Sequence, residues 1–403
     1  MIHALNEALS KLWNVTESDV PYLLNIEKNL CMVDVLLKPY LEQNGESFGG
    51  TYINVKMNKI IIRIVDETKK DIILNSSDIQ PHRELLIFVP ALNSLPSLKN
   101  SLREIIAKSR THRPISVFIY IDIEENNIVI FLSQITDKLN KRFIDAIRQY
   151  NPVILHKNEN AQEQPSIKQH TNSTHTKREI DRQIINGDAI YNLGSITRCT
   201  AGFWIIDKEL RNYIVTAGHC IDSNNTTLDH NTFYMMPLNS SDEELRFRKG
   251  DAIGPMVLHD LKKSDFGLIG ITNVDIKPTR VIRNTDSDPY RQLFIKDREI
   301  ISTHGAHLCK SGATTFVTCG YTKSFEGYFI LRDDIIDDLI VTDFLSAKGD
   351  SGGPVFYLRD LPYVSLHGIL IKGFNVRDWG YFTFIVKTGF IIDKTRLTIK
   401  LGG

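Results

Sequence analysis

Apolar residues near the start of the chain recur at helical spacing. Between residues 5 and 45 they fall three or four positions apart, which is typical of amphipathic helices. The pattern is carried by Leu23, Leu24, Ile26, Leu30, Val33, Leu36 and Leu37. Pro21 and Pro39 interrupt it, so we expect the helical segment to break at both prolines.

Strands and helices alternate after residue 48. Residues 49–65 predict two β-branched strands joined by a turn at Met57-Asn58-Lys59. Further elements are predicted over 97–109 (helix), 115–123 and 127–132 (strands) and 134–149 (helix). Residues 1–155 therefore predict one α+β domain.

The segment from 156 to 183 has a different composition. It is polar and contains almost nothing that a core could bury, so it is predicted to be a linker. Its basic residues Lys177, Arg178 and Arg182 would be accessible to a processing protease.

Short strand-like segments separated by Gly, Asn, Asp and Pro fill residues 184–403. They are predicted over 201–206, 213–217, 266–271, 316–319, 339–343, 354–357, 365–371 and 380–386, with a short helix over 388–393. This pattern favours an all-β domain of two packed β-barrels.

Composition narrows the class of protein. The chain has 403 residues, 42% of them hydrophobic, and is too long for one compact core. Lys and Arg total 48, as do Asp and Glu, so no net charge favours nucleic acid or an anionic membrane as a partner. The apolar stretches also stop well short of the roughly eighteen residues that a membrane span needs.

Three short sequences point to nucleophilic catalysis by a serine. They are Thr216-Ala217-Gly218-His219-Cys220, Ser264-Asp265-Phe266-Gly267 and Gly349-Asp350-Ser351-Gly352-Gly353-Pro354. A serine hydroxyl is a poor nucleophile unless a base takes its proton and a third group orients that base. We therefore predict Ser351 as nucleophile, His219 as base and Asp265 as the orienting acid.

These sequences and their order resemble the chymotrypsin-like serine endopeptidases over about residues 184–403. Within that family the chain is most similar to the alpha-lytic protease and streptogrisin branch. The similarity lies in Cys309-Lys310-Ser311-Gly312-Ala313-Thr314-Thr315 with Cys319-Gly320, and in Phe48-Gly49-Gly50-Thr51-Tyr52 of its pro-region. The resemblance implies two six-stranded antiparallel barrels, preceded by an α+β pro-region that assists folding and inhibits the protease until cleaved. It implies no cofactor, and the cysteines show no metal-ligand spacing.

The glycines around Ser351 allow a sharp turn, so the amides of Gly349 and Ser351 are predicted to form an oxyanion hole. In digestive members of the family Asp350 would pair with a new N-terminal ammonium, at Ile184 or Ile185 here, but the alpha-lytic branch does not depend on that pair. Other residues compete for the roles of base and acid but lie in dissimilar surroundings. They are His230, His259, His304, His307, His367, Asp222, Asp251 and Asp260.

Four of the five cysteines lie in the C-terminal part of the chain. A Cys199–Cys220 bond would join two neighbouring strands beside the base, as in the resembled family. Cys309 and Cys319 flank a polar turn, which predicts a second bond across a hairpin. The alternative is four buried free thiols. Cys31 is expected to be an unpaired core residue.

The resemblance also implies a pocket for the side chain before the scissile bond. Its predicted lining is Leu345, Ser346, Leu370, Ile371 and Gly373. Leu345 stands where recognition of Lys or Arg would require a carboxylate, so we expect a preference for apolar side chains. Ile371 replaces a serine that supports the catalytic aspartate in the family, which affects expected efficiency more than class.

The predicted protein is a secreted, monomeric serine endopeptidase precursor that acts on polypeptides, with its own pro-region as intramolecular partner. Its parts are a pro-region (1–155), a linker with the processing site (156–183) and the protease domain (184–403). Disulfides and glycosylation sequons fit secretion, although the first residues lack the apolar run of a signal peptide. The alternatives are a weak or inactive protease-fold binding protein and an esterase for small acyl substrates.

Overall fold

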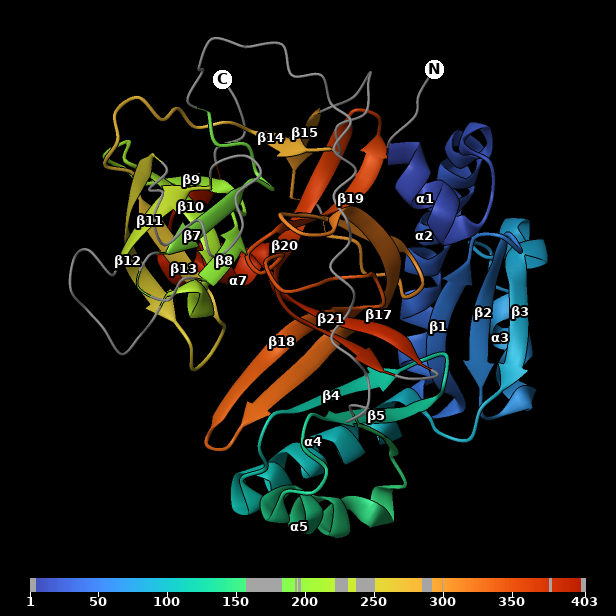
Figure 1. Ribbon diagram of the computed structural model, residues 1–403. Coiled ribbons are helices and arrows are strands. Elements are labelled where there is room, and N and C mark those ends of the chain that lie inside the picture. Colours follow the sequence, from blue (N-terminus) through green and yellow to red (C-terminus); the bar gives the residue numbers. More distant parts are fainter. Residues whose placement is uncertain are drawn as a thin grey trace.

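The structure is a computed structural model that describes most of the chain. The described residues are 5–156, 183–192, 194, 197–221, 231–236, 251–284, 292–298, 300–376 and 379–399. We call residues 5–156 the N-terminal region and residues 183–399 the C-terminal region. Figure 1 shows the N-terminal region, coloured blue through teal to green, to the right of and below the strand-rich C-terminal region.

Two helices open the N-terminal region, α1 (Leu5–Trp13) and α2 (Val20–Gln43). The predicted break at Pro39 is wrong, because Pro39 lies inside α2. A proline there frees the carbonyl of Val35, and Val35 is 53% exposed, so water can bind that oxygen. Pro21 lies in the first turn, where its missing N–H costs little. Within the described residues no helix has both the length and the apolar character needed to cross a membrane.

A three-stranded sheet follows. β1 (Phe48–Asn54) and β2 (Lys59–Ile64) form the predicted antiparallel hairpin, with Asn54 paired to Lys59. The short helix α3 (Lys70–Leu74) then leads to β3 (Leu86–Pro90), which pairs parallel to β2.

A second group of helices and strands completes the N-terminal region. Its elements are α4 (Leu95–His112), β4 (Val117–Asp122), β5 (Asn127–Leu132), α5 (Lys138–Ile147) and β6 (Val153–His156). Apolar residues of the helices, such as Leu102 and Phe143, pack with Ile119 and Ile130 of β4 and β5 in one buried cluster. Both helices therefore cover one face of this strand pair (Figure 1).

Strands β7 to β13, together with β22 from the end of the C-terminal region, form an eight-stranded sheet with the order β22-β9-β10-β13-β12-β11-β7-β8. The strands are β7 (Ala189–Asn192), β8 (Thr197–Thr200), β9 (Trp204–Ile206), β10 (Asn212–Ala217), β11 (Thr232–Met235), β12 (Ala252–Asp260), β13 (Phe266–Gly270) and β22 (Thr398–Ile399). Just before β22, the predicted closing helix is present as α7 (Thr388–Thr395).

An eleven-stranded sheet contains the remaining strands together with β4, β5 and β6. Its strands from the C-terminal region are β14 (Val281–Arg283), β15 (Gln292–Asp297), β16 (His307–Gly312), β17 (Phe316–Leu331), β18 (Asp334–Thr342), β19 (Pro354–Asp360), β20 (Tyr363–Val376) and β21 (Gly380–Lys387). β17 is much longer than the predicted strand over 316–319, because it continues into a hairpin with β18. Closure of either sheet into a barrel stays a prediction.

The two regions share this sheet, because β17 pairs antiparallel with β4 of the N-terminal region. Phe329 lies opposite Phe118 in this register, and their rings stack with centroids 4.2 Å apart. Figure 1 shows β4 beside the extended strands of the C-terminal region. The N-terminal region therefore satisfies a strand edge that would otherwise expose unpaired backbone groups.

Helix α2 brings two buried acids to the C-terminal region. Glu27 is fully buried, and its carboxylate accepts hydrogen bonds from the backbone N–H of His307 at 2.8 Å and from His307 Nδ1 at 2.5 Å. Asp34 accepts from the hydroxyls of Thr51 (2.6 Å) and Thr303 (2.8 Å), and its burial raises its pKa. These contacts define how α2 is seated.

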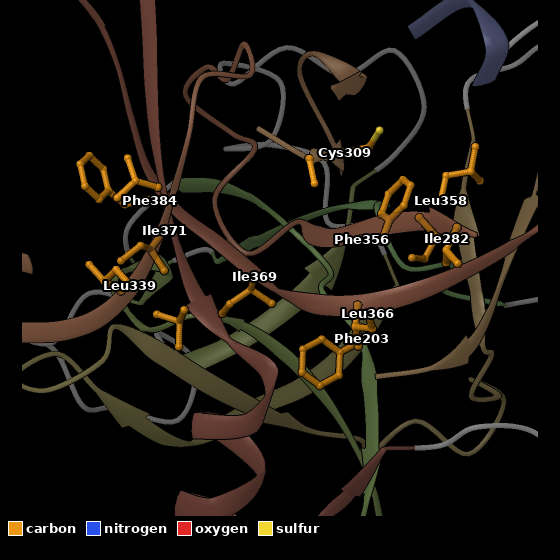
Figure 2. Close-up of a cluster of buried hydrophobic side chains, with 14 of the residues drawn as sticks. Phe203, Ile282, Cys309, Leu339, Phe356, Leu358, Leu366, Ile369, Ile371 and Phe384 are labelled. Atoms are coloured by element: carbon orange, nitrogen blue, oxygen red, sulfur yellow. The ribbon is translucent and has the colours of Figure 1, made fainter. Parts of the chain in front are cut away.

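One large apolar core lies around β19 and β20. Figure 2 shows some of its side chains, including Phe203, Ile369 and Phe384, which come from different strands and loops. Ile371 is 1% exposed and belongs to the same core. Because β19 begins just after Ser351, this core supports the segment that carries the predicted nucleophile.

Candidate active site

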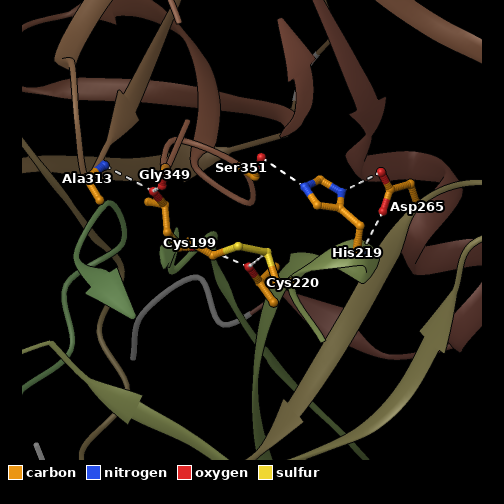
Figure 3. Close-up of a disulfide and its surroundings, with 9 residues drawn as sticks. Cys199, His219, Cys220, Asp265, Ala313, Gly349 and Ser351 are labelled. Atoms are coloured by element: carbon orange, nitrogen blue, oxygen red, sulfur yellow. Dashed lines mark hydrogen bonds and ion pairs between the residues drawn. A yellow bond between two sulfur atoms is a disulfide. The ribbon is translucent and has the colours of Figure 1, made fainter. Parts of the chain in front are cut away.

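The structure brings His219, Asp265 and Ser351 together (Figure 3). His219 Nε2 lies 3.0 Å from Ser351 Oγ, and His219 Nδ1 lies 2.7 Å from Asp265 Oδ2. The other carboxylate oxygen of Asp265 accepts the backbone N–H of His219 at 2.9 Å. An acid held on Nδ1 leaves Nε2 free to accept the serine proton, so the arrangement suits general-base activation of Ser351.

Strand pairing explains how the base meets its acid. β10 and β13 are antiparallel neighbours, and Ala217 at the end of β10 faces Phe266 at the start of β13. His219 follows β10 in a short 3-10 turn, Gly218–Cys220, and Asp265 directly precedes β13. Asp265 has φ +57°, a left-handed conformation that Asp adopts more readily than most residues.

The loop before Ser351 has two amides that can bind an anion. In the described part of the chain, neither the Gly349 amide nor the Ser351 amide has an acceptor. Gly349 has φ +104°, and a Cβ there would lie 2.3 Å from Thr314 Oγ1, so only glycine fits without strain. Both amides predicted to form the oxyanion hole therefore lie at the nucleophile without an acceptor among the described residues.

Asp350, beside the nucleophile, is fully buried and faces the ammonium of Lys310 at 3.4 Å. Its carboxylate also accepts from the backbone N–H groups of Thr314 (2.8 Å), Thr315 (3.0 Å) and Ala347 (3.0 Å) and from the Thr315 hydroxyl. Lys310 thus supplies the cationic partner of Asp350 from within the described chain.

Burial shifts the pKa values of Asp350 and Lys310 in opposite directions. Burial by itself raises the pKa of Asp350, but Lys310 and the surrounding donors hold that pKa below its usual range. Burial lowers the pKa of Lys310 against the attraction of Asp350. Four donors besides Lys310 surround the Asp350 carboxylate and stabilise its charged form, so we infer that the pair is ionic near neutral pH.

The role of Lys310 was not predicted from the sequence. Lys310 lies between two buried strand residues, Cys309 and Ser311, and a lysine inside such a strand is almost never fully buried without a partner. The position of this lysine within the strand was therefore the signal in the sequence that could have indicated a buried ion pair. The partner could not be read from the sequence, because Asp350 is forty residues away.

Both predicted disulfides are present, Cys199–Cys220 and Cys309–Cys319. The first joins the end of β8 to the residue after His219 (Figure 3). The second joins directly opposed residues of β16 and β17. Cys31 is a free thiol on α2 and is partly exposed.

The competing histidines are engaged elsewhere or lie outside the described residues. His307 binds Glu27, and His367 Nε2 accepts the backbone N–H of Ile301 at 2.9 Å. Burial lowers the pKa of His304 and of His367 to about 4. His259 is exposed on β12, and His230 lies outside the described residues.

Of the competing acids, Asp260 makes its contacts away from His219 in the described part of the chain. Asp260 Oδ1 accepts the backbone N–H groups of Lys262 and Lys263, each at 3.0 Å, in a turn. Asp251 is exposed just before β12, and Asp222 lies outside the described residues. Among the described residues no group of His, Cys, Asp or Glu is arranged to hold a metal ion.

The residues predicted to line the substrate pocket differ in their surroundings: some lie at a polar contact around Ser346, and others are packed in the apolar core. Ser346 Oγ lies 2.9 Å from Thr383 Oγ1, and a Cβ on Gly373 would lie 1.8 Å from the same Ser346 oxygen. Leu345 is half-buried, whereas Leu370 and Ile371 are each 1% exposed and contribute mainly to packing. Thr383 was not predicted, because nothing in the sequence around it on β21 distinguishes it from other strand residues.

Two curated proteins resemble the chain in sequence. Serine protease 1 of Streptomyces fradiae is 28% identical over 177 residues, which are 44% of this chain and 43% of that protein. Serine protease 2 of Streptomyces fradiae is 28% identical over 174 residues, which are 43% of this chain and 87% of that protein. The chain thus spans less than half the length of the first relative. No family model matches the chain.

A comparison with solved structures matches about half of the chain to several proteases. They are Thermobifida fusca protease A (20% identity, TM-score 0.41, 55% of this chain and 100% of that one), a glutamic acid specific serine protease (22%, 0.42, 54% and 100%) and an alpha-lytic protease homolog (18%, 0.42, 54% and 98%). In sequence the chain is thus similar to two serine proteases of Streptomyces fradiae over 43 to 44% of its length.

Proposed function

We propose that the protein is a serine endopeptidase that hydrolyses peptide bonds through an acyl-enzyme on Ser351. The observation that carries this proposal is the position of His219, whose two ring nitrogens lie 3.0 Å from Ser351 Oγ and 2.7 Å from Asp265 Oδ2. A histidine held in this way can take the serine proton and return it to a leaving group.

The reaction proceeds in two displacements. Ser351 Oγ attacks the peptide carbonyl while its proton moves to His219 Nε2, and the amides of Gly349 and Ser351 bind the oxyanion that forms. His219 then gives that proton to the leaving amine as the C–N bond breaks, which leaves an ester on Ser351. A water molecule repeats the sequence and releases the acid. Asp265 keeps the Nδ1 proton in place and stabilises the imidazolium.

We further propose that the substrate pocket prefers uncharged, apolar side chains. In support, the Ser346 hydroxyl donates to Thr383 Oγ1 at 2.9 Å, the Thr383 hydroxyl donates to the Phe344 carbonyl at 3.0 Å, and Leu345 rather than a carboxylate precedes Ser346. A charged side chain would lose hydration there without gaining an opposite charge. Cleavage of a peptide library mainly after Arg, Lys or Glu would overturn this preference.

The N-terminal region is proposed to be a pro-region that assists folding and restrains the protease until the linker is cut. The β4–β17 pairing and the Glu27–His307 contact support a dedicated fit between the two regions. Sheets with many non-local pairings fold slowly, so a partner that templates a strand would speed folding. Secretion and a monomeric state belong to the same proposal, and the two disulfides favour an oxidising compartment.

Labelling with a fluorophosphonate tests the proposed activity. The unmutated protein should label, and a fragment about the size of residues 184–403 should appear on the gel. Ser351→Ala should neither label nor shorten. Ser18→Ala, at an exposed serine of the N-terminal region, is the matched control and should behave like the unmutated protein.

Absence of labelling, even after limited proteolysis of the linker, would refute the proposed enzymatic activity. It would favour the alternative of a protease-fold binding protein. Labelling with turnover of small esters but of no peptide would favour an esterase instead.

A further inference from the structure

A buried threonine connects the segments around the candidate site. Thr200 ends β8, is fully buried and uses all of its polar groups. Its hydroxyl donates to the Gly349 carbonyl at 2.7 Å and accepts the Ala313 N–H at 3.0 Å. Its own N–H donates to the Ser351 carbonyl at 2.8 Å, and its carbonyl accepts from Thr216 Oγ1 at 2.9 Å.

The peptides on either side of Gly349 set the direction of its amide. In a planar trans peptide the carbonyl oxygen and the N–H point in opposite directions. The Lys348 carbonyl accepts from Thr314 Oγ1 at 2.7 Å, so the Gly349 N–H points away from Thr314. Thr200 holds the next peptide through the Gly349 carbonyl. Glycine at φ +104° adds no side chain to restrain this segment, so these two hydroxyls supply the restraint.

Thr200 also anchors the neighbouring loop. Its hydroxyl accepts a hydrogen bond from the Ala313 N–H. The next residue, Thr314, donates its hydroxyl proton to the Lys348 carbonyl. One hydroxyl therefore acts on Gly349 directly and through Thr314. Figure 3 shows Ala313 and Gly349 close together on one side of Ser351, with His219 on the other.

The same residue lies next to the disulfide that borders the base. Cys199 precedes Thr200 in the chain and is bonded to Cys220, which follows His219. β8 belongs to the eight-stranded sheet, whereas Ser351 leads into β19 of the eleven-stranded sheet. Thr200 therefore ties the nucleophile segment to the strand framework that carries the base.

We propose that Thr200 is a positioning residue that orients the oxyanion-binding amides before substrate arrives. The proposal rests on the proposed peptidase function. The Thr200 hydroxyl does not touch the reacting atoms, and its effect is transmitted through the Gly349 carbonyl and the Ala313 amide. Its loss should therefore weaken binding of the transition state more than binding of the substrate.

The test compares Thr200→Val with Thr200→Ser in the full chain after processing. Valine keeps the shape but leaves the Gly349 carbonyl and the Ala313 amide unpaired, whereas serine keeps the hydroxyl. Removal of an oxyanion donor typically costs about 100- to 1,000-fold in kcat, and a misaligned donor should cost less. We expect Thr200→Val to lower kcat about 10- to 100-fold with KM nearly unchanged. Thr200→Ser should retain kcat within about threefold.

A second readout separates positioning from general destabilisation. A peptide aldehyde, which forms a tetrahedral adduct on the serine, should bind Thr200→Val more weakly by about the same factor as kcat/KM falls. The pH dependence of kcat/KM should stay unchanged, because His219 and Asp265 keep their contacts. If Thr200→Val does not fold, Thr314→Val tests the same argument, since it frees the Lys348 carbonyl, and the same loss in kcat is expected.

The outcomes are distinct. Unchanged kcat in folded Thr200→Val, or an equal loss in Thr200→Ser, would overturn the positioning role, because the hydroxyl would then not matter. Failure of the unmutated protein to turn over any peptide would overturn the proposed function and this inference with it. A loss in kcat confined to the valine variant, with the aldehyde weakened in parallel, supports the inference.

Discussion

Replacing Lys310 by methionine removes the positive charge opposite Asp350 and leaves the strand and its packing volume nearly unchanged. Both side chains are fully buried, with 3.4 Å between Nζ and the carboxylate. Removing one partner of a buried ion pair typically costs about 3 to 5 kcal/mol, because the other charge stays buried without compensation. Because Asp350 precedes Ser351, the same change should also disturb the oxyanion amides and reduce kcat.

The loss of stability should depend on pH in a defined direction. The folded-state pKa of Asp350 is lowered, so its stabilising contribution is present above the unfolded-state value of about 3.9 and is lost as pH falls through the folded-state pKa. When Lys310 is removed, only hydrogen bonds oppose the effect of burial on Asp350, so the folded-state pKa of Asp350 rises. Between the folded-state pKa of Asp350 in the unmutated protein and its higher value in Lys310→Met, only the variant has a protonated Asp350. The stability difference between the two proteins should therefore be smaller at pH 4 than at pH 7.

The assay is equilibrium unfolding in urea, with Ser351→Ala in both proteins to prevent self-cleavage. Lys11→Met is the control, because Lys11 forms an exposed pair with Glu7 (73% and 50% exposed) and its loss should change little. A loss below about 1 kcal/mol for Lys310→Met at pH 7, or a difference that grows on acidification, would refute the ionic reading of this pair.

Two further changes test other contacts. Asp265→Asn should lower kcat about 10,000-fold, because an amide N–H facing His219 Nδ1 forces the proton onto Nε2 and removes the base; a fall of less than tenfold in steady-state peptide hydrolysis would contradict this. Glu27→Gln places an N–H₂ group against the donors of His307, so the unfolding free energy should fall by about 1.5 to 3 kcal/mol. Hydrogen exchange in α2 should then accelerate, and unchanged exchange there would count against its seating by Glu27.

Much of the local structure followed from spacing along the chain. The β1–β2 hairpin, the strand over 127–132 and the helices near 97–109 and 388–393 were predicted close to their observed positions. Pro39 was misjudged because the cost of a proline depends on whether water can reach the freed carbonyl, and the exposure of Val35 comes from tertiary packing.

The residues proposed to carry the chemistry could also be chosen from the sequence, because each sits in a short local sequence. Ser351, His219 and Asp265 were chosen from the sequences around them, and the structure brings them within hydrogen-bonding distance. Their supporting residues were overlooked. Thr200 and Lys310 are single polar residues in strands, and their neighbours in the sequence do not indicate which residues they contact. Gly349, the partner of the Thr200 hydroxyl, lies 149 residues away.

The sequence alone determined the periodic elements, the candidate triad and the cysteine pairs, because helical and strand periodicity and short motifs arise between near neighbours in the chain. Only the tertiary structure decided that β17 extends to pair with β4, that α2 presents Glu27 to His307 and that Lys310 neutralises Asp350. The physical reason is that strand edges and buried charges accept many partners of suitable chemistry. Which one they meet is selected by the register and packing of the whole chain.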